Sequence, residues 1–130
     1  MANELILIVE DNEKNRKLAR DVLQVNRYRT VEVESGEDAL DLLDREKPDL
    51  ILMDIHLPGM SGIDALKKLR EKPALSAIPV LAFTASVMPQ DRSEIMSAGF
   101  DGFVSKPVNL KEFIATLAKF LSKGQGEGKA

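Results

Sequence analysis

The sequence predicts one α/β domain, in which five parallel strands form a doubly wound sheet with five helices on its two faces. Short apolar runs, typical of buried strands, alternate with segments in which apolar residues recur at helical spacing. The chain has 130 residues, the size of one ordinary domain, and shows no internal repeat or interdomain linker. We expect the domain to span residues 1–122 and residues 123–130 to form a flexible tail without core-forming side chains.

The first part of the chain predicts a strand, a helix and a second strand. Residues 5–9 are an apolar, β-branched run, which favours a buried strand. Asp11 or Asn12 can cap the helix that follows, which we expect to end near Gln24. Its apolar residues at helical spacing are Leu18, Val22 and Val25. Residues 30–33 alternate between polar and apolar, as in a short strand at a sheet edge.

The middle of the chain predicts two more helices around a central strand. Residues 35–38 open the second helix, and Lys47-Pro48 ends it because proline disfavours helix in the residue before it. The apolar residues on its inner side are Ala39, Leu40, Leu42 and Leu43. Residues 49–54 are an apolar run closed by Pro58-Gly59, which predicts a fully buried strand leading into a loop. A third helix up to Pro73 is marked by Ile63, Leu66 and Leu69.

The last part predicts two strands and two unlike helices. Residues 78–84 form a strand whose proline lies near its start, where a missing N–H is tolerated. The helix expected at residues 88–98 should be loosely held, since its only large apolar residues are Val87, Ile95 and Met96. Residues 102–105 form the short fifth strand. The final helix is the most clearly amphipathic one, with Leu110, Phe113, Ile114, Leu117, Phe120 and Leu121 on one side.

Composition narrows the class of partner and the compartment. The net charge of −3 argues against nonspecific binding to nucleic acid or to an anionic membrane, which calls for a basic face. The absence of cysteine excludes disulfides, thiolate metal sites and a cysteine nucleophile, and it agrees with a cytoplasmic location. The N-terminus is not basic, and its apolar run is too short for a signal peptide. No stretch approaches the roughly 20 apolar residues of a membrane span.

Charged and hydroxyl side chains follow or end four of the predicted strands. Right-handed crossovers place the carboxyl ends of parallel strands at one edge of the sheet, so these side chains should converge there. They are Glu10, Asp11, Asp54, Thr84 and Lys106. Carboxylates held this close raise one another's pKa, and a hard divalent cation such as Mg²⁺ would relieve the repulsion. We expect direct metal ligation by Asp11 and Asp54, a water-mediated contact from Glu10 and a backbone carbonyl ligand from His56.

A carboxylate beside Mg²⁺ can attack phosphorus and form an aspartyl phosphate. In this interpretation Asp54 is the nucleophile, Lys106 pairs with a phosphoryl oxygen and Thr84 donates its hydroxyl to another. Each residue alone also has an ordinary explanation, such as a loop cap for Asp54, a helix cap for Glu10-Asp11 or a surface turn for Lys106. Their joint placement at separate strand ends favours the chemical interpretation.

Four segments together resemble the receiver domain of two-component response regulators. They are EDN at 10–12, MDIHLPGMSG at 53–62, AFTA at 82–85 and SKP at 105–107. The resemblance covers residues 5–121, and the segments are specific in this order and spacing. Single-domain regulators of the DivK type look most similar.

The resemblance implies a flavodoxin-like (CheY-like) fold with strand order 2-1-3-4-5, an order that general accounts of doubly wound folds give for this family. It implies that Asp54 accepts a phosphoryl group from a histidine kinase or a histidine phosphotransfer protein, with Mg²⁺ required and Mn²⁺ able to replace it. It also implies a switch, in which Thr84 turns toward the phosphoryl group and Phe103 swings inward. The fourth helix, fifth strand and fifth helix then signal to a downstream protein. Since Phe103 lacks the hydroxyl of the more usual tyrosine, its rotamer should depend on burial alone.

The function expected is therefore signalling by a cytoplasmic, single-domain regulator that catalyses only its own phosphorylation and slow dephosphorylation. We expect a monomer and leave open a dimer linked to phosphorylation, or a receiver fragment of a larger regulator or hybrid kinase. A small Mg²⁺-dependent phosphatase is the enzymatic alternative, but a site of the haloacid-dehalogenase type calls for an acid where His56 stands. In a flavodoxin, Glu10-Asp11 would repel the flavin phosphate.

Overall fold

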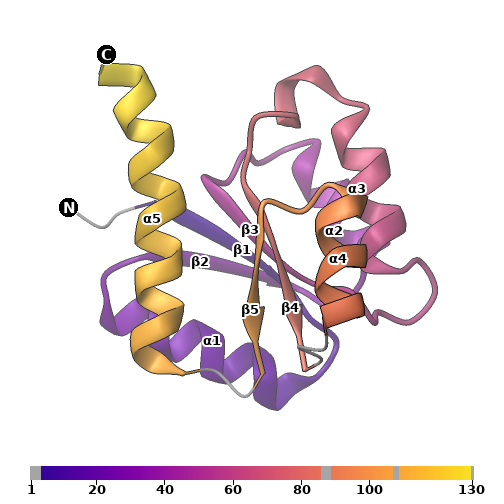
Figure 1. Cartoon of the computed structure of the whole chain (residues 1–130), viewed down its shortest axis with the longest axis horizontal. Helices are drawn as coiled ribbons and strands as arrows, with labels where there is room; N and C mark the ends of the chain where they lie inside the picture. Colours follow the sequence, from indigo (N-terminus) through magenta and orange to yellow (C-terminus); the bar gives the residue numbers. More distant parts are fainter. Residues whose placement is uncertain (1–3, 86–88, 107–108, 130) are drawn as a thin grey trace.

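Five parallel strands form one sheet in the order β2-β1-β3-β4-β5, and helices cover both of its faces (Figure 1). The computed structural model describes residues 4–85, 89–106 and 109–129. The strands are β1 (Leu5–Val9), β2 (Arg29–Val33), β3 (Leu50–Asp54), β4 (Val80–Thr84) and β5 (Gly102–Ser105). The helices are α1 (Glu13–Val25), α2 (Gly36–Leu43), α3 (Gly62–Arg70), α4 (Pro89–Ala98) and α5 (Leu110–Lys129), with a short 3-10 helix, η1, at Pro73–Leu75. The predicted fold class and strand order are confirmed.

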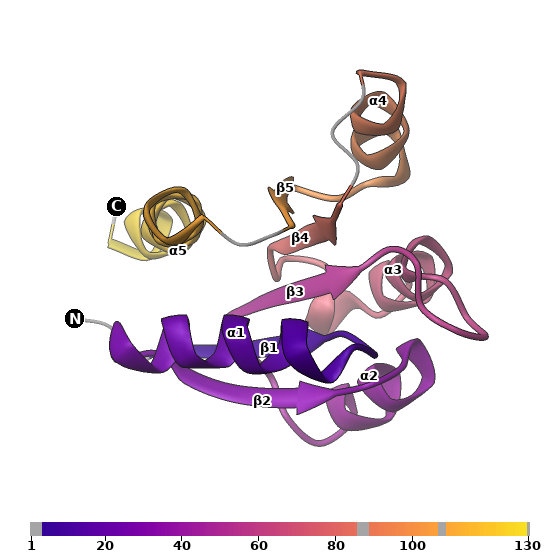
Figure 2. The same cartoon turned by 90° about the horizontal axis from the view of Figure 1, so that it is seen from below.

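Two apolar cores lie on opposite faces of the sheet, one under α1 and α5 and the other under α2, α3 and α4 (Figures 1 and 2). Successive strand residues face opposite sides, so Ile6 and Ile8 belong to the first core while Leu7 and Val9 belong to the second. Every residue of β1, β3 and β4 is buried. Apart from Asp54 and Thr84 at their carboxyl ends, these strands are continuous apolar runs, as expected for a parallel sheet covered on both faces.

Helix α1 turns a different side to the sheet from the one predicted. Leu18 and Val25 are 43% and 80% exposed, whereas Ala19 and Leu23 are buried against the sheet. The helical spacing of Leu18 and Val25 therefore did not mark the buried side of α1, because a pattern of large side chains does not detect a small alanine. Ala19 has almost no side chain, so a helix can approach the strands closely at that position. Of the two candidate caps, Asn12 takes the role and accepts a hydrogen bond from the N–H of Asn15 at 3.0 Å.

Two other helix boundaries differ from the predictions, and the predicted start of a third helix lies outside the described residues. Helix α2 ends at Leu43, before Lys47-Pro48, because the N–H groups of Arg45 and Glu46 both turn back to the carbonyl of Leu42. Helix α5 continues to Lys129 and so enters the segment expected to be a tail; a helix propagates through backbone hydrogen bonds and needs no further core residue. Helix α4 begins at Pro89, and residues 87 and 88, which were assigned to it, lie outside the described residues.

The described part of the chain holds no helix that combines the length and the apolar character needed to cross a membrane.

Candidate functional site

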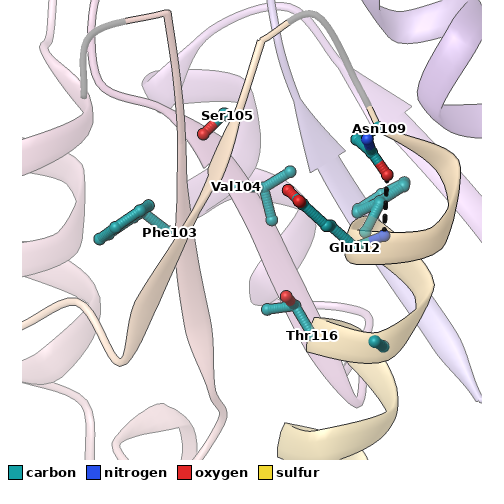
Figure 3. Close-up of a pocket in the computed structure, with 8 residues that line it drawn as sticks. Phe103, Val104, Ser105, Asn109, Glu112 and Thr116 are labelled. Carbon is teal, nitrogen blue, oxygen red and sulfur yellow. Dashed lines mark hydrogen bonds between the residues drawn. The ribbon is translucent and has the colours of Figure 1, made fainter.

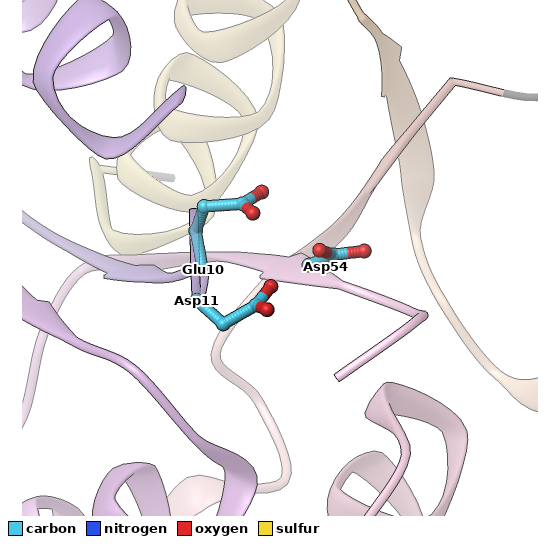
Figure 4. A group of neighbouring side chains, drawn as sticks. All are labelled: Glu10, Asp11 and Asp54. Atoms are coloured by element: carbon cyan, nitrogen blue, oxygen red, sulfur yellow. The ribbon is translucent and has the colours of Figure 1, made fainter. Parts of the chain in front are cut away.

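Three carboxylates meet at the carboxyl edge of the sheet, where β1 and β3 lie side by side (Figure 4). Glu10 and Asp11 directly follow β1, and Asp54 is the last residue of β3. One oxygen from each of the three lies within 4.8 Å of the others. Glu10 and Asp54 are only 1% and 4% exposed, whereas Asp11 is open to solvent. The predicted convergence of these acids is confirmed.

Lys106 reaches this cluster from the end of β5. Its ammonium donates a hydrogen bond to Asp54 Oδ2 at 3.1 Å and lies 2.7 Å from Glu10 Oε1. The same nitrogen sits 4.8 Å from the centre of the Phe83 ring, which helps to hold a partly desolvated cation. The backbone N–H of Lys106 donates to the carbonyl of Thr84 at 2.8 Å, so the start of the side chain is fixed by the sheet. Lys106 thus contacts two acids, whereas sequence reasoning assigned it only a phosphoryl oxygen.

Burial and neighbouring charges have opposing effects on the pKa values of both Glu10 and Lys106. Burial raises the pKa of Glu10; Lys106 and the N–H of Asn12 act against it, and the nearby Asp54 adds to the rise. Burial alone would lower the pKa of Lys106, but the contact with Glu10 and the charge of Asp54 outweigh it and raise that pKa. The ammonium is therefore held in its charged form, while the Glu10 carboxylate is not fully compensated.

The residues present fit a hard divalent cation. Glu10 Oε1 is buried and, despite the nearby ammonium, makes no hydrogen bond of acceptable geometry with the described residues. Three carboxylates face one ammonium, which leaves an excess of negative charge at this edge. Carboxylate oxygens at an open, partly hydrated site are the ligands that Mg²⁺ prefers. Glu10, Asp11 and Asp54 are the residues that would hold it.

The carboxylate of Asp54 is held by its own loop as well as by Lys106. Its Oδ1 accepts a hydrogen bond from the backbone N–H of His56 at 2.9 Å, while the imidazole of His56 is exposed. The backbone of His56 therefore lies beside the acid, and its predicted role as a carbonyl ligand remains a prediction.

Gly62 is the first residue of α3 and packs directly against the end of β3. A Cβ at this position would lie 2.3 Å from the Asp54 carbonyl oxygen and 2.7 Å from Ile55 Cα. The N–H of Gly62 also donates to the carbonyl of Ile55 at 3.2 Å. Sequence reasoning assigned no role to Gly62, and a glycine after a serine cap was the only local signal for one.

The two predicted switch residues occupy neighbouring strands. Thr84 is the last residue of β4, is 1% exposed and pairs with Ser105 of β5. Phe103 is half-buried against the core under α2, α3 and α4, and the Arg92 guanidinium of α4 lies 5.1 Å from its ring centre. The Phe103 ring thus has a cationic neighbour besides its apolar contacts, and the dependence of its rotamer on burial alone stays a prediction.

A hollow of about 310 Å³ lies between β5 and the first half of α5 (Figure 3). Glu112 and Thr116 line it from α5, and Asn109 lines it from just before the helix. Phe103 also borders the hollow, although its ring points to the other side of the strand. The carboxylate cluster takes no part in its lining.

Comparison with known proteins agrees with this geometry. The model of the response regulator receiver domain matches residues 6–118. The polar-differentiation response regulator DivK of Brucella ovis is 44% identical over 116 residues, which cover 89% of this chain and 94% of that protein.

Solved structures show the same arrangement. The chemotaxis response regulator CheY4 of Vibrio cholerae has a TM-score of 0.86 at 25% identity, covering 92% of this chain and 99% of that one. The receiver domain of a sensor histidine kinase from Pseudomonas aeruginosa, solved with a magnesium ion coordinated in its active site cleft, has a TM-score of 0.86 at 30% identity, covering 93% and 99%. The acidic edge, the order of the strands and the extent of these matches lead to one conclusion: the chain belongs to the receiver domain family of two-component response regulators and is DivK-like.

Proposed function

We propose that this protein accepts a phosphoryl group on Asp54 from the phosphohistidine of a histidine kinase or a histidine phosphotransfer protein. The observation that carries the proposal is the setting of Asp54. Its carboxylate is buried, held by the His56 N–H and the Lys106 ammonium, and placed beside two further acids. That arrangement supports a nucleophile that is oriented in advance and charge-neutralised at the moment of transfer.

In the transfer, a carboxylate oxygen of Asp54 bonds to phosphorus as the phosphorus–nitrogen bond of the phosphohistidine breaks. The electron pair of that bond stays on the imidazole nitrogen. Mg²⁺ held by Glu10, Asp11 and Asp54 would supply neutralisation of the phosphoryl charge. Lys106 offers its ammonium to a phosphoryl oxygen, and the side chain of Thr84 offers a hydroxyl from the next strand.

The output is contact with a protein rather than chemistry on a separate substrate. Thr84 at the end of β4 and Phe103 on β5 connect the acidic edge to α4, since Phe103 is in contact with Arg92 of that helix. Phosphorylation would change the surface formed by α4, β5 and α5, and a downstream protein would read that change. We infer a cytoplasmic regulator that catalyses only its own phosphorylation and slow dephosphorylation, with no nucleic acid or membrane as partner.

A second candidate is a receiver that forms one part of a larger kinase. Two of the similar solved structures, at 31% and 30% identity, are receiver domains of histidine kinases. An immunoblot of the source cells separates the two candidates, because a single-domain regulator migrates at the 14.4 kDa of this chain and a hybrid kinase migrates far above it.

The phosphorylation itself is tested with a small phosphodonor such as acetyl phosphate and intact mass spectrometry. We expect one phosphoryl group with Mg²⁺, none in EDTA and none in Asp54→Asn. The matched control is Asp64→Asn, which removes an exposed aspartate in the first turn of α3 and should be phosphorylated like wild type. Acid-labile phosphate on Asp54→Asn at the wild-type level would overturn the assignment.

A further inference from the structure

We propose that Arg16 is a positioning residue for the metal ligands, and that Glu32 on the edge strand holds Arg16 in place. The inference rests on the proposed function, because it assigns a role in building the Mg²⁺ site. It concerns residues outside the carboxylate cluster, on α1 and β2, which none of the predicted site roles includes.

The Arg16 guanidinium donates hydrogen bonds to the backbone of the loop that carries Glu10 and Asp11. Its Nη1 donates to the carbonyl oxygens of Glu10 at 2.9 Å and Asp11 at 3.2 Å. Because the carbonyls of these two residues are held by Arg16, the orientation of this loop relative to β3 is constrained from the side of α1. The side chains that leave the same two residues meet Asp54.

The guanidinium is itself anchored to a neighbouring strand. Arg16 Nε lies 3.5 Å from Glu32 Oε1, and Glu32 Oε2 accepts a hydrogen bond from Arg20 Nη1 at 3.1 Å. Glu32 lies on β2, which pairs with β1, so Glu32 and the loop of Glu10 and Asp11 belong to adjacent strands. The Arg16 side chain is only 14% exposed, which fits a group fixed by several contacts more than a solvated surface charge.

A purely electrostatic role and a positioning role of Arg16 predict opposite effects on metal affinity. A positive charge beside a divalent cation site repels the cation, so removal of the charge would tighten metal binding if charge were its only effect. A positioning role has the opposite sign: removal of the guanidinium releases two carbonyls and loosens the loop. Groups that orient metal ligands without touching the metal typically change affinity by one or two orders of magnitude.

The experiment measures Mn²⁺ binding by the electron paramagnetic resonance signal of the free ion, with Mg²⁺ as competitor. We expect Arg16→Met to weaken Mn²⁺ binding about tenfold. We expect Arg16→Lys, which keeps the charge, to weaken it about threefold or more, since one ammonium cannot replace the planar fork. The matched control is Lys17→Met, which removes an equal charge from the adjacent, exposed position, where the lysine pairs only with Asp21 among the described residues. It should bind Mn²⁺ as wild type does or slightly more tightly.

Two further measurements distinguish a positioning role of Arg16 from a general contribution to the stability of the fold. Urea unfolding in EDTA reports the stability of each variant without metal, and the Mn²⁺ titration is run where circular dichroism shows each to be folded. Glu32→Gln should also weaken Mn²⁺ binding in an otherwise wild-type chain. If Glu32 acts through Arg16, the double variant Arg16→Met with Glu32→Gln should bind Mn²⁺ no more weakly than Arg16→Met alone.

The outcomes distinguish this inference from the proposed function. If wild type binds no Mn²⁺ and takes up no phosphate, the proposed function fails and the positioning role fails with it. If wild type binds and Arg16→Met binds as tightly or more tightly, only the positioning role is overturned. Should Arg16→Met fail to fold, wild-type affinity in both Arg16→Lys and Glu32→Gln would overturn it equally.

Discussion

The contact between Gly62 and the Asp54 backbone allows a small substitution to test how closely the proposed phosphorylation site is packed. A Cβ at Gly62 would lie 2.3 Å from the Asp54 carbonyl oxygen, and real Cβ contacts essentially never fall below 3.0 Å. In Gly62→Ala the two segments must therefore separate by at least about 0.7 Å. The backbone of residue 62 fixes the position of the Cβ, and the atoms that it meets are main chain, so no side-chain rotation can relieve the clash.

We expect Gly62→Ala to lose about 1–3 kcal/mol of stability, as overpacked substitutions do. We also expect Asp54 to be phosphorylated about tenfold to a hundredfold more slowly, because displacements near 1 Å at a reacting group have effects of that size. Stability is measured by urea unfolding. The phosphorylation rate is measured with acetyl phosphate and Mg²⁺ at a temperature where the variant is fully folded, which separates displacement of Asp54 from unfolding.

Gly36→Ala is the matched control, since Gly36 is also the first residue of a helix that follows a serine cap. A Cβ there would lie 3.2 Å from Ala65 Cβ and 3.4 Å from the Met60 carbonyl oxygen, which are tight contacts but do not overlap. It should cost less than about 1 kcal/mol and leave the phosphorylation rate unchanged. Equal stability and equal rates for Gly62→Ala and wild type would refute the reasoning.

Three further predictions concern the lysine, the buried glutamate and the mobility of α4. Lys106→Ala should lose about 1–3 kcal/mol of free energy of unfolding, because two buried carboxylates lose their ammonium, but it should remain folded. It should also lose the phosphorylation-dependent shift of the Val104 amide in NMR spectra, and a retained shift would contradict the role of Lys106. The control is Lys111→Ala, at an exposed position. Burial raises the pKa of Glu10 above its ordinary 4.5, so folding favours its protonated form, and in EDTA the protein should lose stability as pH rises through the raised pKa. Glu10→Gln should abolish that loss and should be more stable than wild type at pH 7 without metal. The control is Glu13→Gln, at an exposed position, which should behave as wild type. A Glu10→Gln variant less stable than wild type would contradict this prediction. The backbone amide hydrogen of Ile95 in α4 should exchange with solvent at least about tenfold faster than that of Leu117 in α5. The reason is that α5 buries Phe113, Leu117 and Leu121, whereas Ile95 is the buried large apolar residue among the described side chains of α4. Equal protection of the two amides would refute this prediction.

Local patterns were sufficient for the strands and for the position of most of the site. Residues 5–9 and 50–53 form buried strands because each is an apolar run with no polar face, and this property is present in the residues themselves. Parallel pairing then requires that the residues after these strands meet, so the convergence of Glu10, Asp11 and Asp54 could be expected before any coordinates.

Local patterns were insufficient where one element must be placed against another. Leu18 looked like a core residue by its spacing, but the sheet lies on the side of Ala19. The helical end of α5 was missed because sequence reasoning stopped at the last core-facing side chain, while backbone hydrogen bonds continue beyond it.

The sequence by itself determined the strands, the acids at their ends and hence the kind of chemistry, because apolar runs and carboxylates keep their character wherever the chain places them. Only the tertiary structure decided how those acids are held. Lys106 reaches both Glu10 and Asp54, Gly62 leaves no space beside the end of β3, and Arg16 ties the acidic loop to the edge strand. Each of these contacts joins elements whose separation depends on the packing of the whole sheet, and spacing along the chain carries no measure of that distance.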